Sequence, residues 1–172
     1  MSIPVEERTI IRQRFDYRCG YCGLHEIWFG DELEIDHFQP LKQGGTDALE
    51  NLVYACAKCN RYKASYWADA NIPQPRHLLH PRYDNITLHI TQNPDGLLVG
   101  LTPRGQFHIH ILHLNRPRLV QLRQLVAVVN KIKQQQTQVE LDSQLVAHKL
   151  YQGEQELSEL QNLITQLARL ME

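Results

Sequence analysis

The segment ELEIDHFQP, residues 32–40, decides the fold because it joins a strand pattern to two chemically reactive side chains. Apolar and acidic residues alternate from Leu33 to Asp36, which predicts a half-buried strand, and Pro40 ends it because proline cannot donate to a sheet ladder. Neighbouring side chains of a strand point to opposite faces. Asp36 and His37 can therefore serve one site only if the chain bends or bulges before Pro40.

All four cysteines form two pairs of identical spacing, Cys19-x-x-Cys22 and Cys56-x-x-Cys59. Each pair places two thiolates on one turn, where a single zinc ion about 2.3 Å from sulfur can accept both. Two disulfides are the alternative in a secreted protein, and a redox dithiol would need a thioredoxin-like βαβ pattern that neither pair has. We therefore predict a closed four-cysteine zinc site that holds the fold together and does not activate water.

The segment between the cysteine pairs carries turn and helix signals after the expected strand. Residues 44–45, Gly-Gly, predict a turn, and Asp47 and Glu50 have the spacing of a capping box that opens a short helix. A further short helix is expected to begin near Cys59. The expected order is strand, loop and helix, pinned at both ends by zinc.

Five sequence elements between residues 8 and 64 carry the chemistry of this region: Cys19-x-x-Cys22, Glu34-Ile35-Asp36-His37-Phe38-x-Pro40, Gly44-Gly45-Thr46, Leu49-Glu50-Asn51-Leu52 and Cys56-x-x-Cys59-Asn60-Arg61-x-Lys63. In this order and spacing they resemble the HNH endonuclease family. The resemblance implies an α+β fold with a ββα-metal core, in which two strands and a helix grip one catalytic divalent cation. That cation is usually Mg²⁺ or Mn²⁺, and the four-cysteine zinc is a structural brace beside it.

The resemblance also implies a role for each matching residue. His37 is the expected general base, Asp36 a ligand of the catalytic cation, and Asn51 the residue that orients the loop bearing His37. Asn60 stands where many members have histidine, which makes the chain an H-N-N variant in which Asn60 is a catalytic residue and a cation ligand. An amide oxygen suits Mg²⁺ as well as an imidazole does.

Hydrolysis of a phosphodiester needs a deprotonated water on one side of phosphorus and a stabilised leaving oxygen on the other. Imidazole exchanges protons near neutral pH, so His37 can take the proton of the water, while a cation held by Asp36 and Asn60 neutralises the leaving oxygen. Arg61 and Lys63 are candidate phosphate contacts, although basic residues beside a zinc knuckle are as often merely solvated. The family resemblance implies cleavage of DNA to a 5′ phosphate and a 3′ hydroxyl.

Two rivals of the nuclease interpretation belong to other functional classes. One is a zinc-dependent nucleic-acid-binding module without catalysis, and the other is a scaffold subunit of a defence or mobile-element assembly. The presence of Asp36, His37 and Asn60 favours the nuclease, because a binding module has no use for a base beside a metal ligand.

The composition favours a globular protein of the cytoplasm. Hydrophobic residues make up 42% of the chain, and no stretch approaches the ~18 consecutive apolar residues of a membrane span. The N-terminal ten residues are acidic where a signal peptide would be basic and then apolar. Residues 64–133 carry eight Lys and Arg against three Asp and Glu, which fits a polyanion partner about as well as an ordinary solvated surface.

We expect a nuclease domain over residues 1–68 and an α+β extension over 69–172, similar to an extension that accompanies some small bacterial HNH proteins. Apolar and polar residues alternate over 85–112 around two turn signals, which predicts a small antiparallel β-meander. His108 and His110 would share an exposed face of one strand there. That account is simpler than a second metal site.

Helices are expected at both ends of the chain. Residues 5–15, VEERTIIRQRF, predict an amphipathic helix with Ile10, Ile11 and Phe15 inward and its arginines solvated. Residues 116–171 predict a helical hairpin, in which KQQQTQ is either a linker or a polar helical turn. A seam about two heptads long near the end consists of Leu157, Leu160, Ile164, Leu167 and Met171. It is short for a coiled coil, so a homodimer through these helices is the alternative to the hairpin.

Overall fold

The computed structural model describes residues 3–170 and divides into two compact units, one ending at Leu125 and the other beginning at Val126. The helices and strands are α1 (Val5–Arg14), β1 (Glu34–His37), β2 (Leu52–Ala55), α2 (Ala57–Lys63), β3 (Ile90–Gln92), β4 (Leu98–Gly100), α3 (Pro103–Ile111) and α4 (Pro117–Leu170). Short 3₁₀ helices lie at Glu26–Trp28, Leu41–Gln43, Gln74–Arg76 and Ile86–Leu88. No helix in this part of the chain combines the length and apolar character that a bilayer crossing requires.

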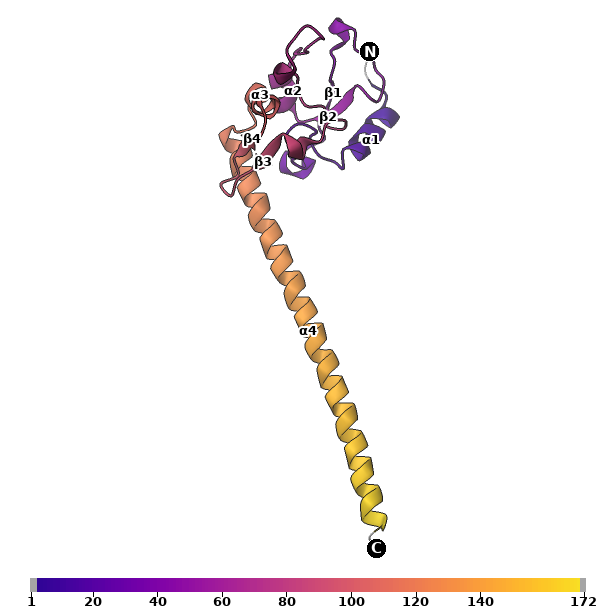
Figure 1. Cartoon of the computed structure of the whole chain (residues 1–172). Helices are drawn as coiled ribbons and strands as arrows, with labels where there is room; N and C mark the ends of the chain where they lie inside the picture. Colours follow the sequence, from indigo (N-terminus) through magenta and orange to yellow (C-terminus); the bar gives the residue numbers. More distant parts are fainter. Residues whose placement is uncertain (1–2, 171–172) are drawn as a thin grey trace. The chain divides into compact units, whose positions relative to one another are not determined.

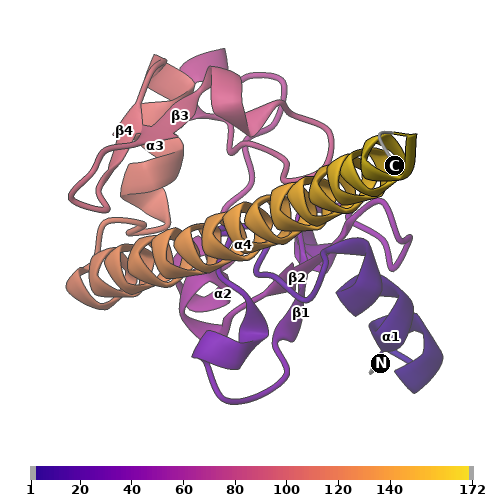
Figure 2. The ribbon, with the colours of Figure 1, turned by 90° about the horizontal axis from the view of Figure 1, so that it is seen from below.

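Two small antiparallel sheets build the first unit, β1 with β2 and β3 with β4 (Figure 1). Seen from below, β1, β2 and α2 form one group, and β3, β4 and α3 form another (Figure 2). The order β1, β2, α2 confirms the predicted α+β class and the ββα core. Whether residues 1–68 and 69–172 fold as separate domains stays a prediction.

The strand β1 is regular to its end. Asp36 pairs with Val53 of β2 and His37 with Leu52, so the register is unbroken. Asp36 is buried and His37 is partly exposed, as expected for neighbours on opposite faces. The strand is therefore regular through His37, and the chain bends only after it, at residues 38–39 just before Pro40.

The strand β2 lies at the centre of the core, because all four of its residues are buried. Burial on both faces explains its continuous apolar sequence, whereas β1 alternates. The Tyr54 hydroxyl satisfies its own hydrogen bonds inside this core: it accepts from the Leu33 N–H at 2.8 Å and donates to Glu26 at 2.6 Å.

The helix α1 packs on β2 through Ile11, with Phe15 buried just after its end, as predicted. Ile10 is exposed instead, because consecutive residues of a helix point about 100° apart and cannot both face one core. Its arginines are not simply solvated either. Arg12 forms an ion pair with Glu26 that ties α1 to the core.

Residues 103–111 form the helix α3, where the sequence pattern predicted a strand of a meander. The Thr102 hydroxyl caps it by accepting from the Gly105 N–H at 3.1 Å, and Pro103 stands at the helix start, where its missing N–H costs nothing. These local cap signals outweigh the alternation of histidine with apolar residues. The predicted meander is reduced to the hairpin of β3 and β4, joined by a turn at 93–97.

The helix α3 places its two histidines, His108 and His110, in different environments. His110 is exposed as predicted, but His108 is only 2% exposed, so the shared exposed face was wrong. The His108 Nδ1 accepts a hydrogen bond from the Leu79 N–H at 3.1 Å, which requires an unprotonated Nδ1. Burial, assisted by the nearby Arg104 charge, lowers the pKa of His108 to about 3.

Acid is therefore expected to destabilise the fold through His108. The unfolded chain protonates this histidine below pH ~6.5, whereas the folded chain protonates it only near pH 3. Stability present above pH ~6.5 is lost as pH falls, by about 3 kcal/mol at about pH 4.5. Urea denaturation of wild type and His108→Gln at pH 7 and 4.5 measures this. Equal losses in the two proteins would contradict it.

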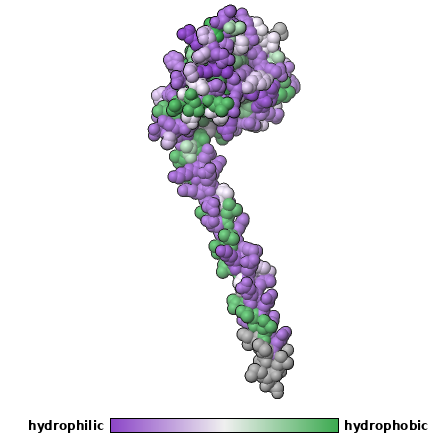
Figure 3. Space-filling model, viewed as in Figure 1, coloured by the Kyte–Doolittle hydropathy of each residue, from purple (hydrophilic) through white to green (hydrophobic). Residues whose placement is uncertain are grey.

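The C-terminal segment is one helix of 54 residues, α4, so the predicted hairpin was wrong within residues 117–170. KQQQTQ at 133–138 continues the helix, because Lys and Gln are good helix formers and no turn residue interrupts them. Figure 3 shows hydrophobic patches separated by hydrophilic surface along it. Of the expected seam, Met171 lies outside the described residues, as do the side chains of Ile164 and Leu167.

Candidate active site and zinc centre

The four cysteines form a buried cluster in which all Sγ atoms lie within 4.8 Å of one another. Four thiolates about 2.3 Å from one zinc ion would stand about 3.8 Å apart, so the cluster fits tetrahedral zinc. Cys19 and Cys22 lie on the turn after α1, whereas Cys56 directly precedes α2 and Cys59 lies in its first turn. The predicted zinc ligands are thus brought together.

Arg116 supplies a positive charge to this cluster that the sequence did not reveal. Its Nη2 lies 3.5 Å from the Cys59 Sγ and 3.8 Å from the Cys56 Sγ, and its guanidinium lies over the Tyr62 ring. Burial lowers the pKa of Arg116, but the neighbouring thiolates outweigh it and the pKa is raised. Four thiolates and one Zn²⁺ carry a net charge of −2, which Arg116 partly balances.

The Asp36 side chain lies in a buried hydrogen-bond network on the inner face of β1. It is 7% exposed, one carboxylate oxygen accepts from the Tyr21 hydroxyl, and the Lys63 ammonium lies 3.1–3.2 Å from both oxygens. Burial raises the pKa of Asp36 although Lys63 and Tyr21 oppose the shift. Burial likewise lowers the pKa of Lys63 against the attraction of Asp36.

The two basic residues expected to contact phosphate differ in position. Lys63 is fully buried at its side chain, and its ammonium also donates to the His37 carbonyl at 2.7 Å. Lys63 therefore positions Asp36 and the end of β1, and its expected contact with phosphate stays a prediction. Arg61 is exposed on α2 and stays a candidate contact.

Asn60 lies on α2 opposite the start of β1. Its Nδ2 donates to the Glu34 Oε2 at 2.7 Å, so the amide oxygen is the side of the group left for a cation. Glu34 and Asp36 are two residues apart in one strand and share a face. Carboxylate and amide oxygens are ligands that suit Mg²⁺ or Mn²⁺. Asp36 already accepts hydrogen bonds from Tyr21 and Lys63, so a cation bound to its carboxylate would compete with the Lys63 ammonium.

His37 is oriented by a residue to which the sequence assigned another role. Its Nε2 lies 2.7 Å from the Asp47 Oδ1. The capping-box helix expected at Asp47 and Glu50 does not form, because residues 49–51 are a turn that leads directly into β2. Because no helix begins here, the Asp47 carboxylate does not cap one and instead contacts His37.

Asn51 clamps the loop that follows His37. Its Nδ2 donates to the Gln39 carbonyl at 2.9 Å and to the Thr46 carbonyl at 2.8 Å, and its Oδ1 accepts from the Gln39 N–H at 2.8 Å. Gly45 makes the clamp possible, since a Cβ there would come within 1.8 Å of the Gln39 oxygen.

Four contact residues of the site were missed by the sequence argument: Tyr21, Glu34, Asp47 and Arg116. Glu34 could have been found, because alternation places it on the face of Asp36. No local pattern marks the other three, since each reaches its partner across 10 or more residues of chain.

Comparison with known proteins finds a sequence similarity in the region of this site. Residues 19–65 match the sequence model described as HNH endonuclease. The chain is also 24% identical over 141 residues to Septu protein PtuA of Bacillus mycoides (strain KBAB4), an alignment that covers 66% of this chain and 20% of that protein. The chain thus spans about one fifth of the length of this curated relative. No solved structure matches the chain significantly.

The match begins at the first cysteine of the cluster and ends just beyond α2. It therefore encloses both cysteine pairs, the paired strands β1 and β2, and the residues that contact Asp36 and His37 from within this segment. Residues 19–65 are an HNH endonuclease domain, with four cysteines positioned to bind zinc.

Proposed function

We propose that this chain is a metal-dependent DNA endonuclease in which His37 activates the attacking water. The observation that carries the proposal is the clamp of Asn51 on Gln39 and Thr46, which fixes the loop following His37. A base that must reach one proton needs such positioning, because a misplacement of about 1 Å can cost 10²-fold in rate.

The pairing of His37 with Asp47 supports a different role for each of the two imidazole nitrogens. With Nε2–H donating to Asp47, Nδ1 carries the lone pair that accepts the proton of the water. The Asp47 carboxylate then stabilises the imidazolium that results, as a carboxylate does in other histidine-dependent hydrolases.

The residues that would hold the catalytic Mg²⁺ or Mn²⁺ are Asp36 and Asn60. When bound, such a cation neutralises negative charge on the scissile phosphate and the leaving oxygen. Glu34 holds the Asn60 amide by accepting from its nitrogen, while Lys63 fixes Asp36. Exposed Arg61 is proposed to bind a flanking phosphate of the DNA.

Nicking of supercoiled plasmid tests the proposal. Zinc-loaded wild type should nick with Mg²⁺ or Mn²⁺ and not without added cation, and His37→Ala should nick about 10²–10⁴-fold more slowly, because general-base catalysis contributes that much. His25→Ala is the control, since His25 lies on the partly exposed turn before the first 3₁₀ helix. Undiminished nicking by His37→Ala would refute the proposed base.

The second candidate function is a non-catalytic nucleic-acid-binding or scaffold subunit of a defence or mobile-element system. The alignment with one fifth of the larger Septu protein PtuA favours keeping it, because part of a larger protein can serve within an assembly. Salt-dependent DNA binding without nicking under any cation condition would support this function over the nuclease.

A homodimer through α4 is the remaining partner proposal. Ile132, Val139 and Val146 are exposed and recur every seven residues, and Leu150 and Leu157 continue the stripe after a shift of four. Such a stripe is stabilised when it packs against a second copy, and a four-residue shift only changes the local winding of the pair.

Light scattering of the full chain tests the dimer. Val139→Lys with Val146→Lys should convert a dimer to a monomer, because each charge would be buried in the seam. Thr137→Lys with Gln144→Lys places the same charges about 160° away on the helix and should leave the mass unchanged. A monomeric wild type would end the proposal.

A further inference from the structure

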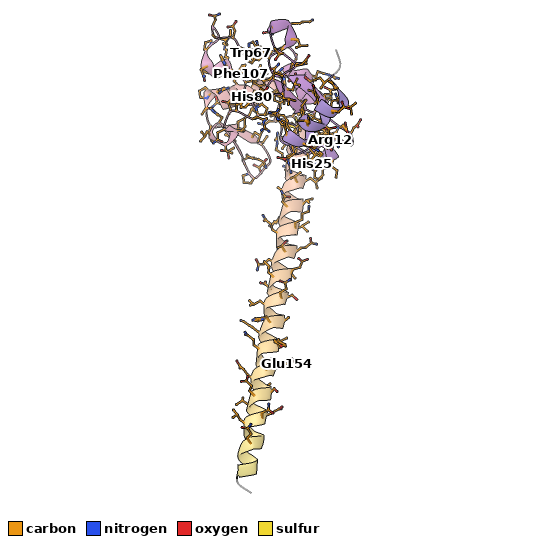
Figure 4. The ribbon with its side chains drawn as sticks, turned by 90° about the vertical axis from the view of Figure 1, so that its right-hand side faces the viewer. Arg12, His25, Trp67, His80, Phe107 and Glu154 are labelled. Atoms are coloured by element: carbon orange, nitrogen blue, oxygen red, sulfur yellow. The ribbon has the colours of Figure 1, made fainter. Side chains whose placement is uncertain are left out.

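An open depression of about 330 Å³ lies beside the loop that Asn51 clamps. Four rings line it, those of Phe38, Trp67, His80 and Tyr83, and we call it the ring pocket. Its volume is within the range of small-ligand sites, which begins near 300 Å³. Trp67 and His80 lie on the same side of the first unit (Figure 4).

The rings of the pocket form a connected cluster in which one pair is stacked. His80 and Tyr83 are stacked with centroids 4.4 Å apart, Phe38 meets His80 edge to face at 4.4 Å, and Phe38 meets Trp67 edge to face at 5.7 Å. Tyr83 is nevertheless 61% exposed, so much of its ring surface remains open to a ligand.

His80 is held as a neutral, fixed member of this cluster. Its Nε2 donates to the Glu50 carbonyl at 3.2 Å, and its Nδ1 accepts from the Arg82 N–H at 3.2 Å. Burial lowers the pKa of His80, which keeps the ring uncharged. A fixed neutral ring offers a flat aromatic surface without loss of side-chain freedom on binding.

The ring pocket is continuous with the catalytic loop. Thr46 and Ala48, which flank the His37 partner Asp47, both line it, and so does Asn51. Phe38, the residue after His37, forms part of its floor. A nucleic-acid strand positioned at His37 would therefore pass this pocket within a short distance of the bond to be cut.

We infer that the ring pocket binds one unstacked nucleobase of the DNA strand on which the neighbouring loop acts. The inference rests on the proposed function, since it takes DNA as the substrate. Partly exposed aromatic rings accept any base by stacking, and the polar side chains of Gln39 and Glu50 at the pocket wall meet its hydrogen-bonding edge. The pocket thus holds the strand in register for hydrolysis.

Binding of single-stranded DNA measures this without any cleavage. The full zinc-loaded chain carrying His37→Ala is titrated into a fluorescein-labelled oligonucleotide of about 20 nucleotides, and anisotropy is recorded. Adding Tyr83→Ala should raise Kd about 5- to 150-fold, since stacking on an aromatic side chain contributes ~1–3 kcal/mol per base. Tyr83→Phe retains the ring and should bind like the parent.

Tyr151→Ala is the matched control, because Tyr151 is 60% exposed and lies on α4 outside the pocket. Single abasic sites moved along the oligonucleotide then identify the contacted base. An abasic site at that position should weaken binding by the parent protein. It should hardly change binding by the Tyr83→Ala protein, which already lacks the stacking contact.

Unchanged Kd for Tyr83→Ala, an equal loss for Tyr151→Ala, or a parent that binds no DNA would each overturn the inference. Plasmid nicking by the chain with His37 intact separates its failure from that of the proposed function. If wild type nicks with Mg²⁺ while Tyr83→Ala binds DNA normally, only the assignment of the ring pocket is wrong and the proposed nuclease function stands.

Discussion

Cys59→Ala is expected to abolish zinc binding and unfold the HNH domain. Cys59 is completely buried in the four-thiolate cluster that joins the turn after α1 to α2. Structural zinc contributes about 10–16 kcal/mol of apparent binding free energy at neutral pH, whereas a whole domain is stable by only about 5–15 kcal/mol. Removing one of four ligands therefore removes more stabilisation than the fold can lose.

The measurements are zinc content by mass spectrometry and folding by circular dichroism. Wild type should hold one zinc ion per chain and unfold when a chelator removes it, and Cys59→Ala should hold little zinc and no ordered core. Lys58→Ala, an exposed neighbour on α2, is the control and should behave like wild type. Normal zinc content in a folded Cys59→Ala protein would overturn the zinc assignment.

Lys63→Met is expected to destabilise the fold by about 3–5 kcal/mol, because it leaves the buried Asp36 carboxylate without its counter-ion. The Asp36 pKa is already raised by burial even with Lys63 present, and removing the ammonium strengthens that effect. The difference in stability from wild type should also shrink as pH falls, since protonation of Asp36 removes the unpaired charge, whereas the loss through His108 is common to both proteins. Urea denaturation at about pH 7 and 5 measures both changes.

A double variant separates the ion pair from simple packing. Asp36→Asn combined with Lys63→Met removes both charges and keeps an acceptor for the Tyr21 hydroxyl, so it should regain most of the lost stability. Lys58→Ala should stay within about 0.5 kcal/mol of wild type. If Lys63→Met and the double variant were equally unstable, the lost packing of the side chain, and not the charge, would explain the effect.

Much of the HNH domain could be predicted because its signals are local or come from spacing. Two cysteine pairs predict one metal, alternation predicts β1, and the family order predicts Asn51 on the loop after His37. The loss of the expected helix at Asp47 shows the limit of such signals. A capping pattern states only that a helix could start, and here the chain instead turns into the buried strand β2.

The extension was harder to predict because its patterns were ambiguous. Residues 107–111 alternate like a strand, yet Thr102 and Pro103 begin a helix and bury His108 against the Leu79 amide. Similarly, the polar run at 133–138 contains no helix breaker, so α4 continues through it.

The sequence alone determined which residues could bind zinc and the order of the ββα elements, because ligand type, spacing and periodicity act over short stretches of chain. Only the tertiary structure decided that Lys63 pairs with Asp36, Asp47 with His37 and Arg116 with the cysteine thiolates. These contacts depend on which faces of β1, α2 and the loops are buried against one another. For the buried groups, Asp36 and the cysteine thiolates, the low dielectric of the packed interior selects a charge partner, and no local pattern encodes that selection.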